Sequence, residues 1–291
     1  MIAELELARA EGVRLLRNPV VWIALVPSAS WVIEDRTGED ASEGRLLVLI
    51  GFGLLIPGFV IMVHTVLAAL RSRSSHTDEL FGTVPVGPDR RSIAHGASGL
   101  AGLAVALVVT GVVYAVIRPG PTIGRGSNYF EGAPIPRPNL AQLLQGPFAV
   151  LAVLSFTLAV VRWIPSWLVI VPLAFAAVVQ GVFLGFWFSE PTGAATWMWP
   201  MATGVVHGEW IGCGDLDAVC DLPVSGFDRA TPWWHLAYLA AVSGFSVVVA
   251  VLRHRRDRAA WSAFAAAAVL VLALGIAQAL VADEYVAVGG P

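Results

Sequence analysis

Long apolar runs separated by short polar segments make up most of this chain. The runs that approach the ~20 residues needed to cross a bilayer are residues 46–70, 95–117, 143–161, 167–188, 233–252 and 260–281. A further run at 20–33 is shorter, and it would cross only if the helix before it continued into it. A segment inside a bilayer must satisfy its own backbone hydrogen bonds, so these runs predict helices. The predicted fold is an all-α, polytopic membrane protein with six to seven transmembrane helices.

Residues 1–18 follow the pattern of an amphipathic helix. The apolar positions that return to one face are Ile2, Leu5, Ala8, Gly12, Leu15 and Leu16. The charged positions predicted to lie mostly off that face are Glu4, Glu6, Glu11, Arg14 and Arg17, while Arg9 intrudes. Such a helix lies in the membrane interface; the alternative is a plain cytosolic leader. The acidic start does not match a signal peptide.

Arginine sets the predicted orientation, because basic residues concentrate on the cytoplasmic side of a membrane. All 18 basic residues are arginine, and the clusters at 71–95 and 253–258 are predicted to be cytoplasmic, together with the N-terminus. The segments predicted to lie outside are 34–45, 118–141, 189–232 and the tail at 282–291. A chain without lysine suggests a GC-rich bacterial genome, so the expected location is the bacterial plasma (inner) membrane.

Composition excludes several classes of function. Hydrophobic residues make up 57% of the chain and charged residues 13%, against about 25% charged in soluble domains. Without lysine the chain has neither a P-loop nor a Schiff-base nucleophile, and it contains no His-Glu-x-x-His or Gly-x-Ser-x-Gly motif. We therefore expect no enzyme activity and no cofactor in this chain. The arginine clusters adjoin apolar runs, which suits anionic membrane lipid better than nucleic acid.

The cytoplasmic segment at 71–95 is longer than a connection between two spans requires. Ser75 with Asp78 is a candidate helix-capping pair, and Pro85 and Pro88 are expected to stop the helix that follows. The apolar side chains that would then lie on a cytosolic surface are Leu80, Phe81 and Val84. They suit a docking helix for a soluble partner, or an ordinary loop whose apolar groups pack under a neighbouring span.

The same segment resembles the loop between the second and third spans of permease subunits of type-2 ABC exporters. The residues that match the family pattern are Arg73, Thr77, Glu79, Leu80, Thr83, Pro85, Val86, Arg90 and Arg91. His76 stands where the family commonly has glycine, and Phe81 replaces a leucine. In that family the segment is a coupling helix that contacts a separate ATPase subunit. The docking residues that the resemblance implies here are Asp78, Glu79, Leu80, Phe81 and Val84.

The resemblance implies the membrane-spanning permease subunit of an ATP-driven exporter, which couples ATP hydrolysis on its partner to substrate export. ATP and Mg²⁺ would belong to the ABC ATPase subunit, and a second permease copy or a paralogue would complete the assembly. Residues 14–19 are similar to the end of the family's elbow helix. The implied domains are an elbow helix at 1–19, a transmembrane domain at 20–281 and a tail at 282–291. The predicted seventh span departs from the family, which usually ends after six.

Two other classes of function fit the same spans. A secondary transporter or channel would need binding groups near the membrane midplane, and usually internal repeats. A membrane anchor or assembly protein would bind a partner through its outer loop. The sequence shows neither midplane binding groups nor repeats.

Small and polar residues within the spans predict helix contacts. The polar residues His64, Gln180 and Gln278 are each expected to form interhelical hydrogen bonds. Gly181 and Gly185 permit close helix approach, either within the chain or at a dimer interface beside the pathway. The glycines at the start of the third span are Gly96, Gly99 and Gly102.

The predicted outer loop at 189–232 carries the only two cysteines, Cys213 and Cys220. On the oxidising side of a membrane a disulfide is the first interpretation; the alternatives are two thiols, or a metal site with His207 and nearby acidic residues. The tryptophans of this loop are too apolar for solvent. Residues 192–211 are therefore expected to dip back toward the membrane, as the corresponding re-entrant helices of type-2 exporters do.

Overall fold

The computed structural model describes residues 2–27, 30, 54–74, 88–117, 140–178, 209–210, 224–227, 231–282 and 285–288. Its helices are α1 (Ile2–Leu16), α2 (Pro19–Ile23), α5 (Leu55–Ser74), α7 (Pro88–Ile117), α8 (Leu140–Trp163), α9 (Ile170–Val178), α12 (Thr231–Leu252) and α13 (Arg258–Ala282), with a 3₁₀ turn, η1 (Trp167–Val169), before α9. The strands are β1 (Glu209–Trp210), β2 (Val224–Phe227) and β3 (Tyr285–Val288).

Within the described ranges, four helices are long and apolar enough to cross a membrane. Their apolar segments are Arg91–Ala115, Leu143–Trp163, Trp233–Leu252 and Arg258–Gln278. The shorter apolar helical segments are Ile56–Leu70 and Trp167–Ala176. The expectation of a helical membrane protein is confirmed in this coarser form, and a count of six to seven crossings stays a prediction.

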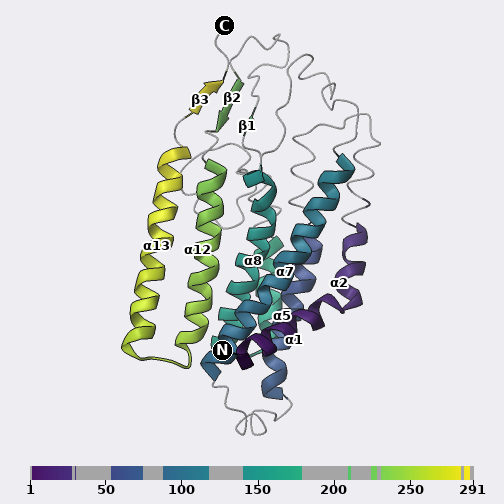
Figure 1. Cartoon of the computed structure of the whole chain (residues 1–291), viewed down its shortest axis with the longest axis vertical. Helices are drawn as coiled ribbons and strands as arrows, with labels where there is room; N and C mark the ends of the chain where they lie inside the picture. The colour runs from purple at the N-terminus through teal and green to yellow at the C-terminus, as the bar shows by residue number, and fades with distance from the viewer. Residues whose placement is uncertain are drawn as a thin grey trace.

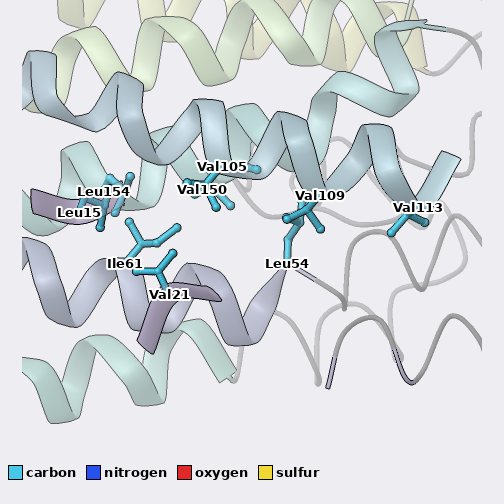
Figure 2. Close-up of a cluster of buried hydrophobic side chains, with 10 residues drawn as sticks. Leu15, Val21, Leu54, Ile61, Val105, Val109, Val113, Val150 and Leu154 are labelled. Carbon is cyan, nitrogen blue, oxygen red and sulfur yellow. The ribbon is translucent and has the colours of Figure 1, made fainter. Parts of the chain in front are cut away.

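Helix α8 lies at the centre of the bundle (Figure 1). It packs against α5, α7 and α12, while α13 packs against α12 at the periphery. One buried apolar cluster, drawn in Figure 2, joins α1, α2, α5, α7 and α8 through Leu15, Val21, Leu54, Ile61, Val105, Val109, Val113, Val150 and Leu154. A second cluster joins α5, α8, η1, α9 and α12 through Met62, Val66, Leu158, Val161, Val169, Leu173 and Ala250. Both clusters include residues of α8, so this helix organises the packing.

Two glycines of α7 let this helix approach its neighbours closely. A Cβ atom added at Gly102 would lie 2.5 Å from Leu154 Cδ1 of α8. One added at Gly96 would lie 2.9 Å from Val247 Cγ2 of α12. Small residues at helix crossings can serve packing within a chain or between chains, and on this part of α7 they serve packing within the chain.

The helices on either side of the predicted cytoplasmic loop are longer than expected. α5 continues to Ser74 and α7 begins at Pro88, so both helices extend into the stretch at 71–95. The sequence predicts that Pro88 helps to stop a helix, but it begins one instead. Proline suits the first helical turn because an N–H there has no partner within the helix.

Helix α1 lies across α7 near one end of the bundle (Figure 1). Its buried positions include Glu11, Gly12 and Leu15, whereas Leu5 and Leu16 are exposed. The face of α1 that packs on the bundle includes a charged residue, Glu11, which the sequence pattern places mostly off the apolar face. The role of α1 as an elbow helix stays a prediction.

The chain turns between α1 and α2 and does not continue as one helix. The side-chain oxygen of Asn18 accepts a hydrogen bond from the backbone N–H of Val20 at 3.1 Å, which caps α2. The indole N–H of Trp22 donates to the carbonyl oxygen of Leu16 at 2.7 Å. These bonds fix the turn, so α1 does not lengthen the short apolar run that follows it.

A small antiparallel sheet lies at the end of the bundle opposite to α1 (Figure 1). Its central strand β2 pairs with β1 on one side and with β3 on the other. Val224 lies opposite Val288, and Phe227 lies opposite Tyr285. The sequence predicts no strands here. The pairing places the described strands of the tail and of the predicted outer loop at the same end of the molecule.

Candidate functional site

The helix ends that carry arginine gather at one end of the bundle, which we name the Arg-rich end. The helices and turns that lie there are α1, the end of α5, the start of α7, the end of α8 and the turn between α12 and α13 (Figure 1). In sequence, these elements and the residue after α1 carry Arg9, Arg14, Arg17, Arg71, Arg73, Arg90, Arg91, Arg162, Arg253, Arg255, Arg256 and Arg258. The segments predicted to be cytoplasmic thus share one end, as a single orientation requires.

The predicted contact and disulfide residues lie outside the described ranges. Those of the docking segment are Asp78, Glu79, Leu80, Phe81 and Val84, and those of the fifth span and the outer loop are Gly181, Gly185, Cys213 and Cys220. The same holds for Gln180 and for the expected re-entrant segment at 192–211, apart from β1. Their roles stay predictions. The attachment points of the docking segment are described, and both lie at the Arg-rich end.

A small polar cavity lies where α1 meets α5, α7 and α8. Its volume is about 20 Å³, enough for about one water molecule. Its polar and ionisable lining residues are Glu11, His64, Thr65, His95, Ser98 and Ser155. Ionisable groups among membrane helices are costly and mark candidate functional sites. This cavity is therefore the candidate site in the described part of the chain.

Glu11 brings a carboxylate from α1 to this cavity. It is only 8% exposed, and its Oε1 accepts a hydrogen bond from Arg14 Nη1 at 2.6 Å. Its Oε2 is buried and has no hydrogen-bond partner among the described residues. A buried oxygen without a partner costs free energy, so a water molecule in the cavity would stabilise this arrangement.

His64 of α5 connects the cavity to the turn after α1. Its Nδ1 lies 3.4 Å from Nδ2 of Asn18. This contact agrees with the expectation that His64 forms a hydrogen bond between helical segments. The hydroxyls of Thr65 and Ser98 donate to the carbonyl oxygens of Ile61 and His95 in their own helices. Their oxygen atoms can still accept a hydrogen bond from water.

The sequence pattern does not identify this cavity, although it contains one signal for it. Glu11 lies four residues before Leu15, so both fall on one face of α1. His95 is shared by the predicted loop at 71–95 and the predicted run at 95–117, and it lies within α7. No group of three His, Cys, Asp or Glu side chains that could hold a metal ion occurs in the described segments.

The cavity joins α1 to three helices of the bundle, two of which bound the predicted docking segment. Its polar lining can hydrogen-bond a water molecule. Comparison of the chain with protein-family models, with curated proteins and with solved structures finds no match.

Proposed function

We propose that this chain is the membrane-spanning permease subunit of an ATP-driven ABC exporter of the type-2 class. The observation that carries the proposal is the attachment of the segment at 75–87 to two long helices that meet at the Arg-rich end. This segment holds Glu79, Leu80 and Phe81, which resemble the docking residues of a coupling helix. A coupling helix must reach a cytosolic partner and must also be joined to the spans. The attachment of this segment to α5 and α7 at the Arg-rich end supports the proposal.

The packing of α5 and α7 would transmit a movement of this segment to the rest of the bundle. Ile61 of α5 and Val105 of α7 belong to the same buried cluster as Leu154 of α8. Close-packed interiors transmit displacements and do not absorb them locally. A partner that moves the ends of α5 and α7 would therefore move α8, and α8 packs in turn against α12.

Helix α1 would follow the same movement. It packs on α7, and the contact between Asn18 and His64 ties its end to α5. In this proposal α1 is the elbow helix, which lies at the cytoplasmic surface of a bacterial plasma membrane. Glu11 and the water-sized cavity make the contact between α1 and the helices α5, α7 and α8 polar, and a water molecule there could rearrange its hydrogen bonds as α1 moves.

The partner in this proposal is an ABC ATPase subunit that carries ATP and Mg²⁺. A chain without lysine has no P-loop lysine, so in this proposal ATP is hydrolysed on another subunit. A second permease copy or a paralogue would complete the transporter. Closure of the two ATPase subunits around ATP would move both docking segments and switch the pathway between the two sides of the membrane.

The double substitution Leu80→Asp with Phe81→Asp tests the proposal. Affinity purification of the tagged wild-type chain from its native host should recover an ATP-hydrolysing subunit. The variant should lose about 90% or more of that subunit, because two charges would replace apolar contacts at the centre of the docking surface. The measurement is the ratio of the two proteins after purification, together with ATPase activity.

Ile164→Asp is the matched control. Ile164 is an apolar residue, 57% exposed, in a different turn at the Arg-rich end, and its substitution should leave the ATPase bound. Equal recovery of the ATPase with both variants would contradict the docking role. A wild-type chain that transports on an ion gradient without any ATPase would favour a secondary transporter instead.

A further inference from the structure

We propose that the two neighbouring turns at the Arg-rich end, between α8 and η1 and between α12 and α13, form a binding site for the headgroup of an anionic phospholipid. We name this site the Arg–Trp surface, and its residues are Trp163, Arg253, Arg256, Arg258 and Trp261. It shares no residue with the predicted ATPase-docking segment, and it does not depend on the exporter proposal.

Contacts of Trp163 hold the two turns together. Its indole N–H donates to the backbone carbonyl oxygen of Val249 at 3.0 Å, which joins the end of α8 to α12. The guanidinium carbon of Arg253 lies 5.7 Å from the centroid of the Trp163 ring, within reach of a cation–π interaction. Trp163 still has 43% of its surface exposed. The ring therefore positions an arginine and remains accessible to another molecule.

The positive charge of this surface is only partly neutralised by the protein. Asp257 is the one acidic residue of the 253–258 turn, and its Oδ2 accepts a hydrogen bond from Arg255 at 2.7 Å. Its Oδ1 accepts one from the backbone N–H of Ala260 at 2.8 Å. These two bonds hold the pKa of the Asp257 carboxyl below its usual value. The carboxylate therefore stays ionised, and both of its oxygens already accept a hydrogen bond within the turn. Arg256 and Arg258 are exposed and form no ion pair within the described segments.

The surroundings of the Arg–Trp surface favour a lipid over a soluble partner. α13 contacts α12 along one face, and the segment Arg258–Gln278 is only 11% buried. Its outward residues are apolar, with Val269 and Leu272 more than 60% exposed. An acyl chain beside this face would bring its phosphate to the level of Trp261, where tryptophan marks the membrane interface. The arginines then lie at the height of the headgroup.

Arginine chemistry favours an anionic headgroup over a zwitterionic one. A guanidinium group offers several N–H donors in a planar fork, which matches phosphate oxygens. A zwitterionic headgroup brings a compensating positive charge, whereas phosphatidylglycerol leaves the phosphate charge uncompensated. Basic residues close to a membrane surface each add to the attraction for anionic lipid.

Titration with defined lipids measures this preference. The full chain, purified in detergent with any subunit that accompanies it, is mixed with phosphatidylglycerol or phosphatidylcholine of the same acyl chains. Native mass spectrometry then counts the lipids that remain bound. The wild type should retain phosphatidylglycerol preferentially. The variant Arg256→Gln with Arg258→Gln should bind it about tenfold more weakly, because two charges at the headgroup are lost.

Arg9→Gln with Arg17→Gln is the matched control, because it removes two exposed arginines, one in α1 and one directly after it. This control variant should still bind phosphatidylglycerol in preference to phosphatidylcholine. An equal loss in both variants, or no loss in either, would overturn the site. So would an unchanged lipid preference together with loss of a co-purified acidic protein, since the surface would then dock a protein.

A measurement on the wild type keeps the proposal testable if the glutamine variant does not fold. Raising the salt concentration from about 0.05 to 0.5 M shortens the range of electrostatic attraction, so the preference for phosphatidylglycerol should fall. A preference that does not change with salt would overturn an electrostatic headgroup site.

Discussion

Single residues decide how closely α7 can pack, and two of its glycines allow a direct comparison. A Cβ atom at Gly102 would lie 2.5 Å from Leu154 Cδ1 and 3.2 Å from Ile61 Cγ2. Leu154 and Ile61 are almost fully buried, so neither side chain has open space to move into. Gly111 lies on the same helix, and a Cβ atom there would meet nothing within 4 Å.

Gly102→Leu is therefore expected to destabilise the folded chain by about 1–3 kcal/mol, as overpacking of a close-packed interior does. Gly111→Leu should change the stability by no more than about 0.5 kcal/mol. Both substitutions replace glycine in a helix, so the gain in helix propensity is common to the two variants. Unfolding in mixed detergent micelles gives the comparison, and equal midpoints would contradict the packing around Gly102.

The residue scale also shows where sequence patterns are least informative. The pattern of α1 places Glu11 mostly off the apolar face, yet this residue is almost fully buried beside His64 and His95. The spacing between Glu11 and Leu15 indicates that they share a face. The polar lining that receives Glu11 comes from distant helices, and no local pattern reveals such a partner.

At the scale of elements, α13 is held to the bundle along a single face. Ala260 and Gln278 lie on this face and are buried, whereas Ile276 and Leu280 point outward. A hydrogen bond crosses the contact between α12 and α13: His235 Nδ1 and Gln278 Oε1 are 3.0 Å apart. This pair agrees with the expectation that Gln278 bonds between helices.

A double-mutant cycle with His235→Leu and Gln278→Leu should give a coupling energy of about 0.5–1.5 kcal/mol. Hydrogen bonds between membrane helices typically contribute in this range. Ser246 provides the control, because its hydroxyl donates to Val242 in its own helix, and Ser246→Ala should show no coupling to Gln278→Leu. Stability is measured by unfolding in mixed micelles. A coupling of zero for the histidine pair would show that the two helices associate by packing alone.

The sequence predicts most of the long elements well, for a physical reason. The apolar runs at 143–161, 233–252 and 260–281 agree closely with α8, α12 and α13, because a tight arginine-containing turn bounds each of these helices at one end. The run at 95–117 misses the first turns of α7. Hydropathy identifies only the apolar part of a helix. The backbone hydrogen bonds of α7 continue through polar residues such as Asp89 and Arg90, which a hydropathy pattern does not include.

At the scale of the whole molecule, the two ends of the bundle differ in chemistry. One end carries the arginine-containing helix ends and α1, and the other carries the β-sheet in which β2 pairs with β1 and β3. The sequence predicts the first from the positive-inside rule. It does not predict the sheet, because short strands paired across a long sequence separation leave little local signal.

A tag placed after Pro291 tests the orientation. The tag should be protected from a cytosolic protease, and a cysteine introduced as His254→Cys in a chain without its two native cysteines should be labelled from the cytosolic side. The reason is that α13 is long and apolar enough to cross once between these positions. The tag and the cysteine on the same side would contradict a crossing by α13. A tag on the cytosolic side with the cysteine on the outer side would contradict the predicted orientation, but it would still agree with a crossing by α13.

The pairing of β2 with β3 also sets an order of events during synthesis. β3 is the last described segment of the chain, and its partner β2 precedes two long helices. In the proposed topology, the sheet can close only after α12 and α13 have both been inserted and β3 has reached the end of the bundle where β2 lies. Until then one edge of β2 lacks its partner and can pair with other chains. The closed sheet then holds the C-terminal end of α13 in place, because α13 could leave the bundle only after β3 had separated from β2.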